Sequence, residues 1–375
     1  MMKADESGRA SNLDWNPRLA HLRGIAALLV LAFHVFHTFH GQWRPFPNAS
    51  GFGWLVEGHT GVSLFFVLSG YLFMTIAQKA DGVIGYREFM RNRVLRIFPL
   101  FVVVFFVAIS IARDGFRPQD ALYLVFSNLG DAPTSKQFMT GAAWTISVEF
   151  TFYLVFPFVA RFALAQGPGY LVRLIGLLFL LKLGAYLVSE RPTHMIYSTL
   201  LGRLDQFLVG MLAAQLAANY KLRAIRGAWV FAAVAVMWAL LEWQMRRASF
   251  FLPQPRQLFW LFWPTLEALG WASVICTYVN WRGVMWAKLG GALERAGEIS
   301  YSLYLWHGLV VYLVSKLVDG RNLTGNAFLN TAVAGLLVLL LSWWVAAMSY
   351  RTIELPFLGL RRRYVGSGGA PSHTQ

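Results

Sequence analysis

The chain has 375 residues, of which 57% are hydrophobic and 14% are charged, and its mean hydropathy is +0.50. Soluble globular domains carry about 25% charged residues, so this composition excludes an ordinary soluble domain and indicates a polytopic membrane protein. The net charge of +15 does not indicate nucleic-acid binding, because Lys and Arg lie in short segments between apolar runs, as membrane topology requires.

Apolar segments recur along the whole sequence, and a membrane-crossing helix takes roughly 20 residues. The segments lie near 20–40, 59–78, 97–113, 143–165, 170–188, 200–219, 228–244, 257–279, 299–318 and 327–350. A weaker segment, 118–130, is a candidate re-entrant or interfacial piece. The fold class is therefore all-α, with about ten transmembrane helices. We expect one transmembrane domain at 19–358, between an N-terminal segment 1–18 and a basic, then disordered, tail 359–375.

The distribution of Lys and Arg predicts the orientation in the membrane. The basic connections are the N-terminus, 79–96, 216–227, 280–298 and the run Arg361 to Arg363, whereas 41–58, 189–199 and 319–326 are nearly free of Lys and Arg. The positive-inside rule then places both termini in the cytoplasm. Three arginines at 246, 247 and 256 argue mildly for the opposite orientation.

The first apolar segment carries Arg23 near its start and His34, His37 and His40 further along. Ionisable side chains inside a bilayer are costly and usually serve a function. Arg23 and His34 are eleven residues apart, which is about three helical turns or roughly 16 Å on one face. A buried neutral imidazole is suited to general-base chemistry, so His34 is the candidate base and His37 a supporting residue. The alternative is a structural histidine bonded to a neighbouring helix.

The segment 86–100 contains Arg93 and Arg96 one turn apart, on one face if this segment is helical. Paired guanidinium groups at a membrane surface bind phosphates. The alternative is ordinary positive-inside charge or lipid-headgroup binding.

Four further segments carry candidate residues. Ser69 and Gly70 favour close helix packing, although a nucleophilic Ser69 is an alternative. Glu149 needs a partner inside the membrane, and Arg23, Arg93, Arg96 or His34 could supply it. A pairing with His34 would orient the imidazole as in a catalytic triad. Arg203 and Asp205 are a candidate internal pair, and His307 is a candidate supporting residue.

Metal chemistry is not expected from this sequence. The three histidines of the first segment resemble a fragment of an integral-membrane di-iron site, but such a site needs more histidines than the eight present. The one cysteine, Cys276, excludes a disulfide framework and a Cys-based metal site.

Taken in order, these motifs resemble the membrane acyltransferase 3 family of bacterial O-acyltransferases, from about residue 13 to 360. The resemblance rests on Arg23 with His34, the SGY at 69–71, the RxxR pair at 93 and 96, WTISVEFTFYL around Glu149, RLDQFLVG at 203–210, YSLYLWH at 301–307 and RTIELPF at 351–357. It implies a ten-helix enzyme in the bacterial inner membrane that moves an acyl group, usually acetyl from acetyl-CoA, to a hydroxyl. No bound cofactor is implied. Some members carry an additional SGNH-type hydrolase domain, for which this chain is too short.

The resemblance assigns roles to the residues. His34 is expected to be the base, with Glu149 as its catalytic partner, and Arg23, Arg93 and Arg96 are expected to bind acyl-CoA. Supporting roles are expected for His37, Ser69, Tyr71, Arg203, Asp205 and His307. The expected acceptor is a surface polysaccharide such as O-antigen or exopolysaccharide, or its lipid-linked precursor; an antibiotic or other small-molecule sugar is the alternative. A proton-coupled transporter using His34, Glu149 and His307 is the alternative of another class.

Overall fold

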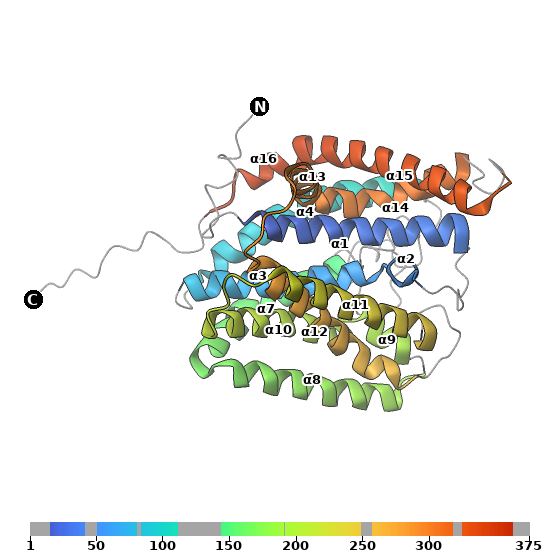
Figure 1. Cartoon of the computed structure of the whole chain (residues 1–375). Helices are drawn as coiled ribbons and strands as arrows, with labels where there is room; N and C mark the ends of the chain where they lie inside the picture. Colours follow the sequence, from blue (N-terminus) through green and yellow to red (C-terminus); the bar gives the residue numbers. More distant parts are fainter. Residues whose placement is uncertain are drawn as a thin grey trace, which may run out of the picture.

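The computed structural model describes residues 16–41, 51–80, 84–111, 144–190, 192–248, 257–317 and 325–362. Long helices run side by side over this part of the chain (Figure 1), and no strand forms within the described ranges. The candidate segment 118–130, the first 15 residues and the end of the tail from 363 lie outside the described residues.

All ten apolar segments of the sequence correspond to helices in the structure. These are α1 (Pro17–Phe36), α3 (Thr60–Lys79), α4 (Tyr86–Ile111), α7 (Trp144–Gln166), α8 (Pro168–Val188), α10 (Leu200–Asn219), α11 (Gly227–Ala248), α12 (Phe259–Val279), α14 (Ser300–Leu317) and α15 (Ala327–Ser349). Eight helical stretches of the described chain are long and apolar enough to cross a membrane. The other two helices, α10 and α14, are of similar length and carry polar residues inside them. The all-α polytopic fold is confirmed.

The connections contain more helix than the sequence predicts. Helix α4 begins at Tyr86, eleven residues before the apolar run at 97, so the RxxR pair lies inside the helix. Short helices occupy connections expected to be loops: α2 (Gly53–Val56), α9 (Pro192–Ser198) and α13 (Ala287–Glu298). Helix α13 is seen nearly end-on in Figure 1, across the direction of the long helices. The search for long apolar segments misses α2 and α9 because they are short, and α13 because it is amphipathic and not apolar throughout.

Two of the long helices end in a π-helical turn. The turn η2 (His37–Gly41) closes α1, and η6 (Tyr350–Glu354) joins α15 to α16 (Leu355–Leu358). At the opposite end of α1, the Asn16 side chain accepts a hydrogen bond from the backbone N–H of Arg18, and Pro17 begins the helix, a favourable N-terminal arrangement.

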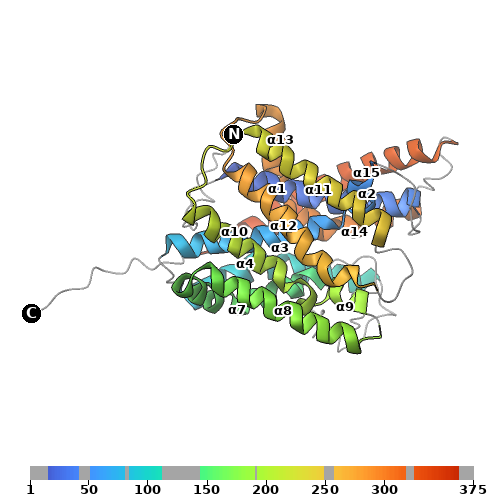
Figure 2. The ribbon, with the colours of Figure 1, turned by 60° about the horizontal axis from the view of Figure 1, so that its bottom comes forward.

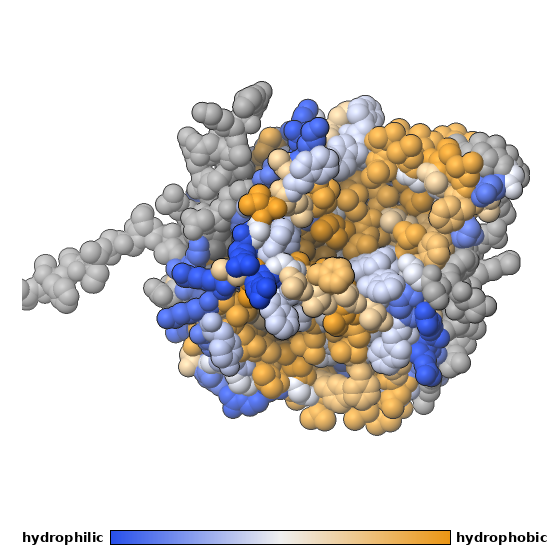
Figure 3. Space-filling view, in the orientation of Figure 1, coloured by the Kyte–Doolittle hydropathy of each residue, from blue (hydrophilic) through white to orange (hydrophobic). Residues whose placement is uncertain are grey.

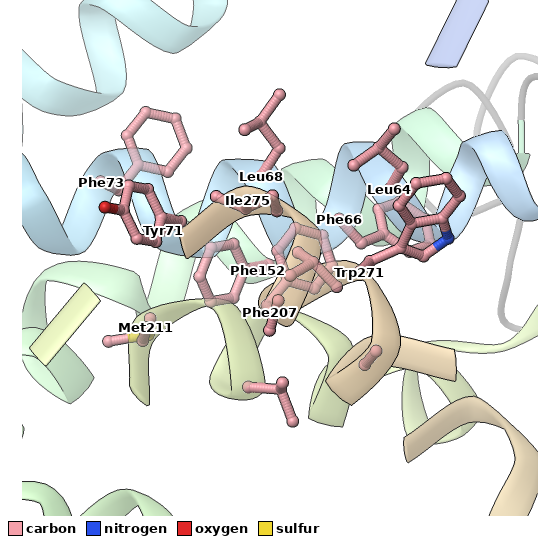
Figure 4. Close-up of a cluster of buried hydrophobic side chains, with 14 of the residues drawn as sticks. Leu64, Phe66, Leu68, Tyr71, Phe73, Phe152, Phe207, Met211, Trp271 and Ile275 are labelled. Atoms are coloured by element: carbon pink, nitrogen blue, oxygen red, sulfur yellow. The ribbon is translucent and has the colours of Figure 1, made fainter. Parts of the chain in front are cut away.

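Helices α3 and α10 cross so closely that glycine is required at the contact. A Cβ on Gly70 would lie 2.1 Å from the Phe207 carbonyl oxygen, and one on Gly210 would lie 2.0 Å from the Val67 carbonyl oxygen. Aromatic rings fill the core beside this crossing (Figure 4): the Phe207 ring stacks on Phe66 at 4.7 Å and on Phe152 at 4.0 Å. The expectation that small residues of the second span serve packing is confirmed for Gly70.

The surface fits a membrane environment. In the face shown in Figure 3, hydrophilic residues gather towards the ends of the helices and a hydrophobic surface lies between them. Helix α8 lies at the edge of the bundle in both ribbon views (Figures 1 and 2) and buries only Leu171 and Lys182. Leu174, Ile175 and Leu178 pack partly buried against the core. The opposite side of α8 is exposed, as expected in a lipid environment, and carries Val172, Leu177, Leu180, Leu181, Leu187 and Val188.

Candidate active site

His34 of α1 and His307 of α14 lie in direct contact. The His34 Nδ1 atom is 2.8 Å from the Val30 carbonyl oxygen and 3.2 Å from Nε2 of His307, whose own Nδ1 is 2.6 Å from the Tyr304 carbonyl oxygen. Carbonyl oxygens only accept, so in the neutral state both imidazoles carry their proton on Nδ1. Nε2 of His34 is therefore the basic nitrogen, as a general base requires.

Glu149 is bonded elsewhere, contrary to the catalytic-triad interpretation. Its Oε1 accepts hydrogen bonds from the hydroxyl of Ser69, at 2.9 Å, and from the hydroxyl of Tyr153. The His34 ring is oriented by the Val30 carbonyl oxygen and by Nε2 of His307, which both contact its Nδ1 atom. Spacing within one helix could not predict this, because Glu149 and His34 belong to different helices whose relative height is set by tertiary packing.

Arg23, Arg93 and Arg96 converge from α1 and α4. Arg23 lies within electrostatic range of both other arginines and of Glu149. Arg93 stacks on the rings of Phe73, at 4.8 Å, and Phe89, at 5.6 Å, and these contacts hold its guanidinium in place. The convergence gathers positive charge that suits a polyanionic ligand.

Arg96 is held by a residue that the sequence did not point to. Its Nη1 donates to Oε2 of Glu354 at 2.7 Å, and the Glu354 carboxylate also accepts from the Ser302 hydroxyl. Glu354 is 2% exposed and belongs to the RTIELPF motif, 258 residues along the chain. The family resemblance named the RTIELPF motif together with the RxxR pair. Nothing in the residues around Arg96 or Glu354 predicts that these two side chains bind each other.

Two helix faces connect the arginines with the histidines. Helix α7 presents Thr145, Glu149 and Tyr153 at a spacing of four residues, and α14 presents Tyr301, Tyr304 and His307 at a spacing of three, so each set shares one side of its helix. The two sides meet where the hydroxyls of Thr145 and Tyr304 lie 2.9 Å apart. Hydroxyl groups thus occupy the interval between the positive charge and the imidazole pair.

The remaining supporting candidates are placed differently. His37 is fully buried, and its Nε2 lies 2.9 Å from the Val56 carbonyl oxygen, so it anchors α2 to α1. Tyr71 is 6% exposed and packs within the hydrophobic core (Figure 4). Neither contact joins these side chains to the arginine cluster or to His307.

Arg203 and Asp205 do not form the expected internal pair. Arg203 donates from Nη1 to Ser63, at 3.0 Å, and lies 3.4 Å from a Glu267 oxygen, whereas Asp205 binds Lys182 of α8 at 2.8 Å. Residues two apart point to different sides of a helix, which is why each finds a partner on another helix. These side chains are about 1–2% exposed and join α3, α8, α10 and α12.

A carboxylate–imidazole pair that was not predicted from the sequence lies in the connection before α3. Glu57 Oε2 lies 2.8 Å from Nε2 of His59, and both side chains are buried. The His59 ring packs edge-on against Phe33, at 5.4 Å, and Phe33 in turn contacts the His34 ring at 5.0 Å. Glu57 lay in a connection that we expected to be a loop outside the membrane, so its burial was not anticipated. Within the described ranges, no three His, Cys, Asp or Glu side chains gather in a way that could hold a metal ion.

Comparison with known proteins finds relatives of this chain. The chain is 25% identical to the O-acetyltransferase OatA of Staphylococcus aureus over 374 residues, covering 91% of this chain and 58% of OatA. It is 34% identical to the acyltransferase MdmB of Streptomyces mycarofaciens over 158 residues, covering 38% of each protein. The chain thus spans less than two thirds of the length of these relatives. No solved structure matches it. The model of the acyltransferase 3 domain matches residues 16–347, and the chain therefore belongs to the acyltransferase 3 family.

Proposed function

We propose that the protein is a membrane O-acyltransferase that moves an acetyl group from acetyl-CoA to a hydroxyl of a cell-surface polysaccharide or its lipid-linked precursor. The observation that carries the proposal is the hydrogen bond from His34 Nδ1–H to the Val30 carbonyl, because it leaves Nε2 as the basic nitrogen. The family and the relative OatA, an O-acetyltransferase, support acetyl transfer to oxygen.

The donor is proposed to bind with its phosphates at Arg23, Arg93 and Arg96. Eleven residues of helix separate Arg23 from His34, which is about 16 Å at 1.5 Å per residue. A pantetheine arm is of comparable length, so phosphates bound at the arginines would place the thioester near the imidazole. The hydroxyls of Thr145 and Tyr304 lie between these points and suit the amides of the arm.

The transfer step follows from this placement. Nε2 of His34 accepts the proton of the acceptor hydroxyl, and the oxygen attacks the thioester carbonyl carbon. The C–S bond then breaks, and the imidazolium returns the proton to the CoA thiolate. His307 holds the Nδ1 side of the His34 ring and so keeps Nε2 turned to the reaction. The arginine end of the bundle is proposed to face the cytoplasm of a bacterial inner membrane, since acyl-CoA is cytoplasmic.

The test is ligand-dependent stability of the purified protein in detergent. Acetyl-CoA at about 100 times its dissociation constant should stabilise the native state by roughly 2.7 kcal/mol. The double substitution Arg93→Ala with Arg96→Ala should abolish this gain. Arg173→Ala is the matched control, because Arg173 is an exposed residue near the start of α8 whose guanidinium donates to the Gly169 carbonyl and the Gln166 side chain. No stabilisation by any CoA ester in folded protein would refute the proposal and favour a proton-coupled transporter.

A further inference from the structure

Two connections between helices, 220–229 and 280–289, carry exposed cations that take no part in the proposed transfer. The first joins α10 to α11, the second joins α12 to α13, and each includes the first residues of the helix that follows. We infer that these cations form a docking surface for the headgroups of anionic phospholipids. This surface is distinct from the site of acyl transfer and does not depend on the transfer reaction.

The charge of the two connections is uniformly positive. They contain no Asp or Glu. Their five basic residues, here called the basic rim, are all exposed: Lys221, Arg223, Arg226, Arg282 and Lys288. Within the described part of the chain, no side chain of the basic rim forms an ion pair. Clusters of about four to eight Lys or Arg beside a membrane helix bind anionic headgroups, so the basic rim has the size and the free charge for this role.

A backbone bridge holds the two connections together. The Ile225 N–H donates to the Asn280 carbonyl at 2.8 Å, and the Arg282 N–H donates to the Ile225 carbonyl at 3.0 Å. Lys221 and Ala224 have φ angles of 47° and 53°, in a region that non-glycine residues rarely adopt. The first connection is therefore held in one particular conformation, and the two halves of the basic rim lie side by side.

The second connection is also fixed to the start of α1. The Arg18 guanidinium donates to the carbonyls of Val279, at 3.0 Å, and Gly283, at 2.8 Å. Helix α13 lies close to the start of α1 in Figure 1, and a Cβ on Gly297 of α13 would lie 2.0 Å from the Ala20 carbonyl oxygen. The basic rim is thus a preorganised surface, which lowers the entropic cost of binding.

Exposed aromatic and apolar side chains lie among these cations. Trp229 is 63% exposed, Trp286 is 69% exposed and Val284 is 91% exposed. Both connections directly adjoin α11 and α12, which are long and apolar enough to cross a membrane, so the connections lie at the level of the headgroups. Indole rings prefer this level of a bilayer. A bilayer surface therefore accommodates the rings together with the cations, whereas a soluble acidic partner would match only the charge.

The experiment measures lipid binding to the whole chain in dodecyl maltoside by native mass spectrometry. Dioleoyl phosphatidylglycerol is the anionic probe and dioleoyl phosphatidylcholine the zwitterionic probe. The wild type should bind the anionic lipid at least about tenfold more tightly. The triple substitution Arg223→Gln, Arg226→Gln and Arg282→Gln should weaken that binding about 10- to 100-fold, because each Lys or Arg near a membrane surface contributes about fivefold in affinity. Unchanged binding of phosphatidylcholine would show that the variant is still folded.

The matched control replaces three exposed arginines outside the basic rim, Arg87, Arg161 and Arg173, by Gln. Both triple variants lose the same net charge, but the control should bind phosphatidylglycerol as the wild type does. No loss in the basic-rim variant, or an equal loss in both variants, would overturn the docking surface. Poly-glutamate at the same charge concentration tests for a soluble acidic partner, and tighter binding of poly-glutamate than of phosphatidylglycerol would overturn the assignment to lipid.

Discussion

The ion pair between Lys182 and Asp205 should be the main polar tie between α8 and the bundle. The two groups are 2.8 Å apart and 1–2% exposed, and α8 otherwise buries only Leu171. Breaking a buried pair by removing one partner costs about 3–5 kcal/mol, because the remaining charge has no compensation. Lys182→Met should therefore lower the free energy of unfolding by that amount, even though Thr265 still donates to Asp205.

Removing both charges should restore most of the loss. Replacing a buried pair by apolar residues of similar size is often neutral, so Lys182→Met with Asp205→Leu should lie within about 1 kcal/mol of the wild type. The assay is equilibrium unfolding of the single and double variants in mixed detergent micelles, analysed as a double-mutant cycle. Additive losses, with no coupling between the two positions, would refute the reasoning.

Two further predictions concern the core and the site. Gly70→Ala should destabilise the protein by about 1–3 kcal/mol, because its Cβ would lie 2.1 Å from the Phe207 carbonyl oxygen. The control is Gly184→Ala, where no atom lies within 4 Å of the new Cβ. Equal stability of the two variants would contradict the close crossing of α3 and α10. His307→Gln should lower kcat about tenfold or more with little change in the KM for acetyl-CoA, since it alters a group that orients His34; an unchanged kcat would remove His307 from the mechanism.

Local pattern predicted much of the fold. Each of the ten apolar segments became a helix, because length and hydropathy alone determine which segments can cross a membrane. The RxxR pair lies on a helix and next to Arg23, as the spacing and the family resemblance led us to expect.

Contacts between distant residues were not predictable from spacing. Glu354 binds Arg96, Lys182 binds Asp205, and Glu267 binds Arg203. In each pair the partners lie on different helices, and the rotation of one helix against another depends on side-chain packing that a single sequence does not display. The hydrogen bonds from Ser69 and Tyr153 to Glu149 were not foreseen for the same reason.

The central claim is that Nε2 of His34 acts as the base. The most direct measurement is a single-turnover transfer from acetyl-CoA to the acceptor by His34→Asn and by the wild type. The Asn side-chain amide can reproduce the Nδ1–H donor to the Val30 carbonyl but has no basic nitrogen. We expect His34→Asn to remain folded and to be stabilised by acetyl-CoA as the wild type is, with transfer at least about 100-fold slower, within the usual contribution of a general base. Transfer at the wild-type rate by that folded, ligand-binding variant would contradict the account.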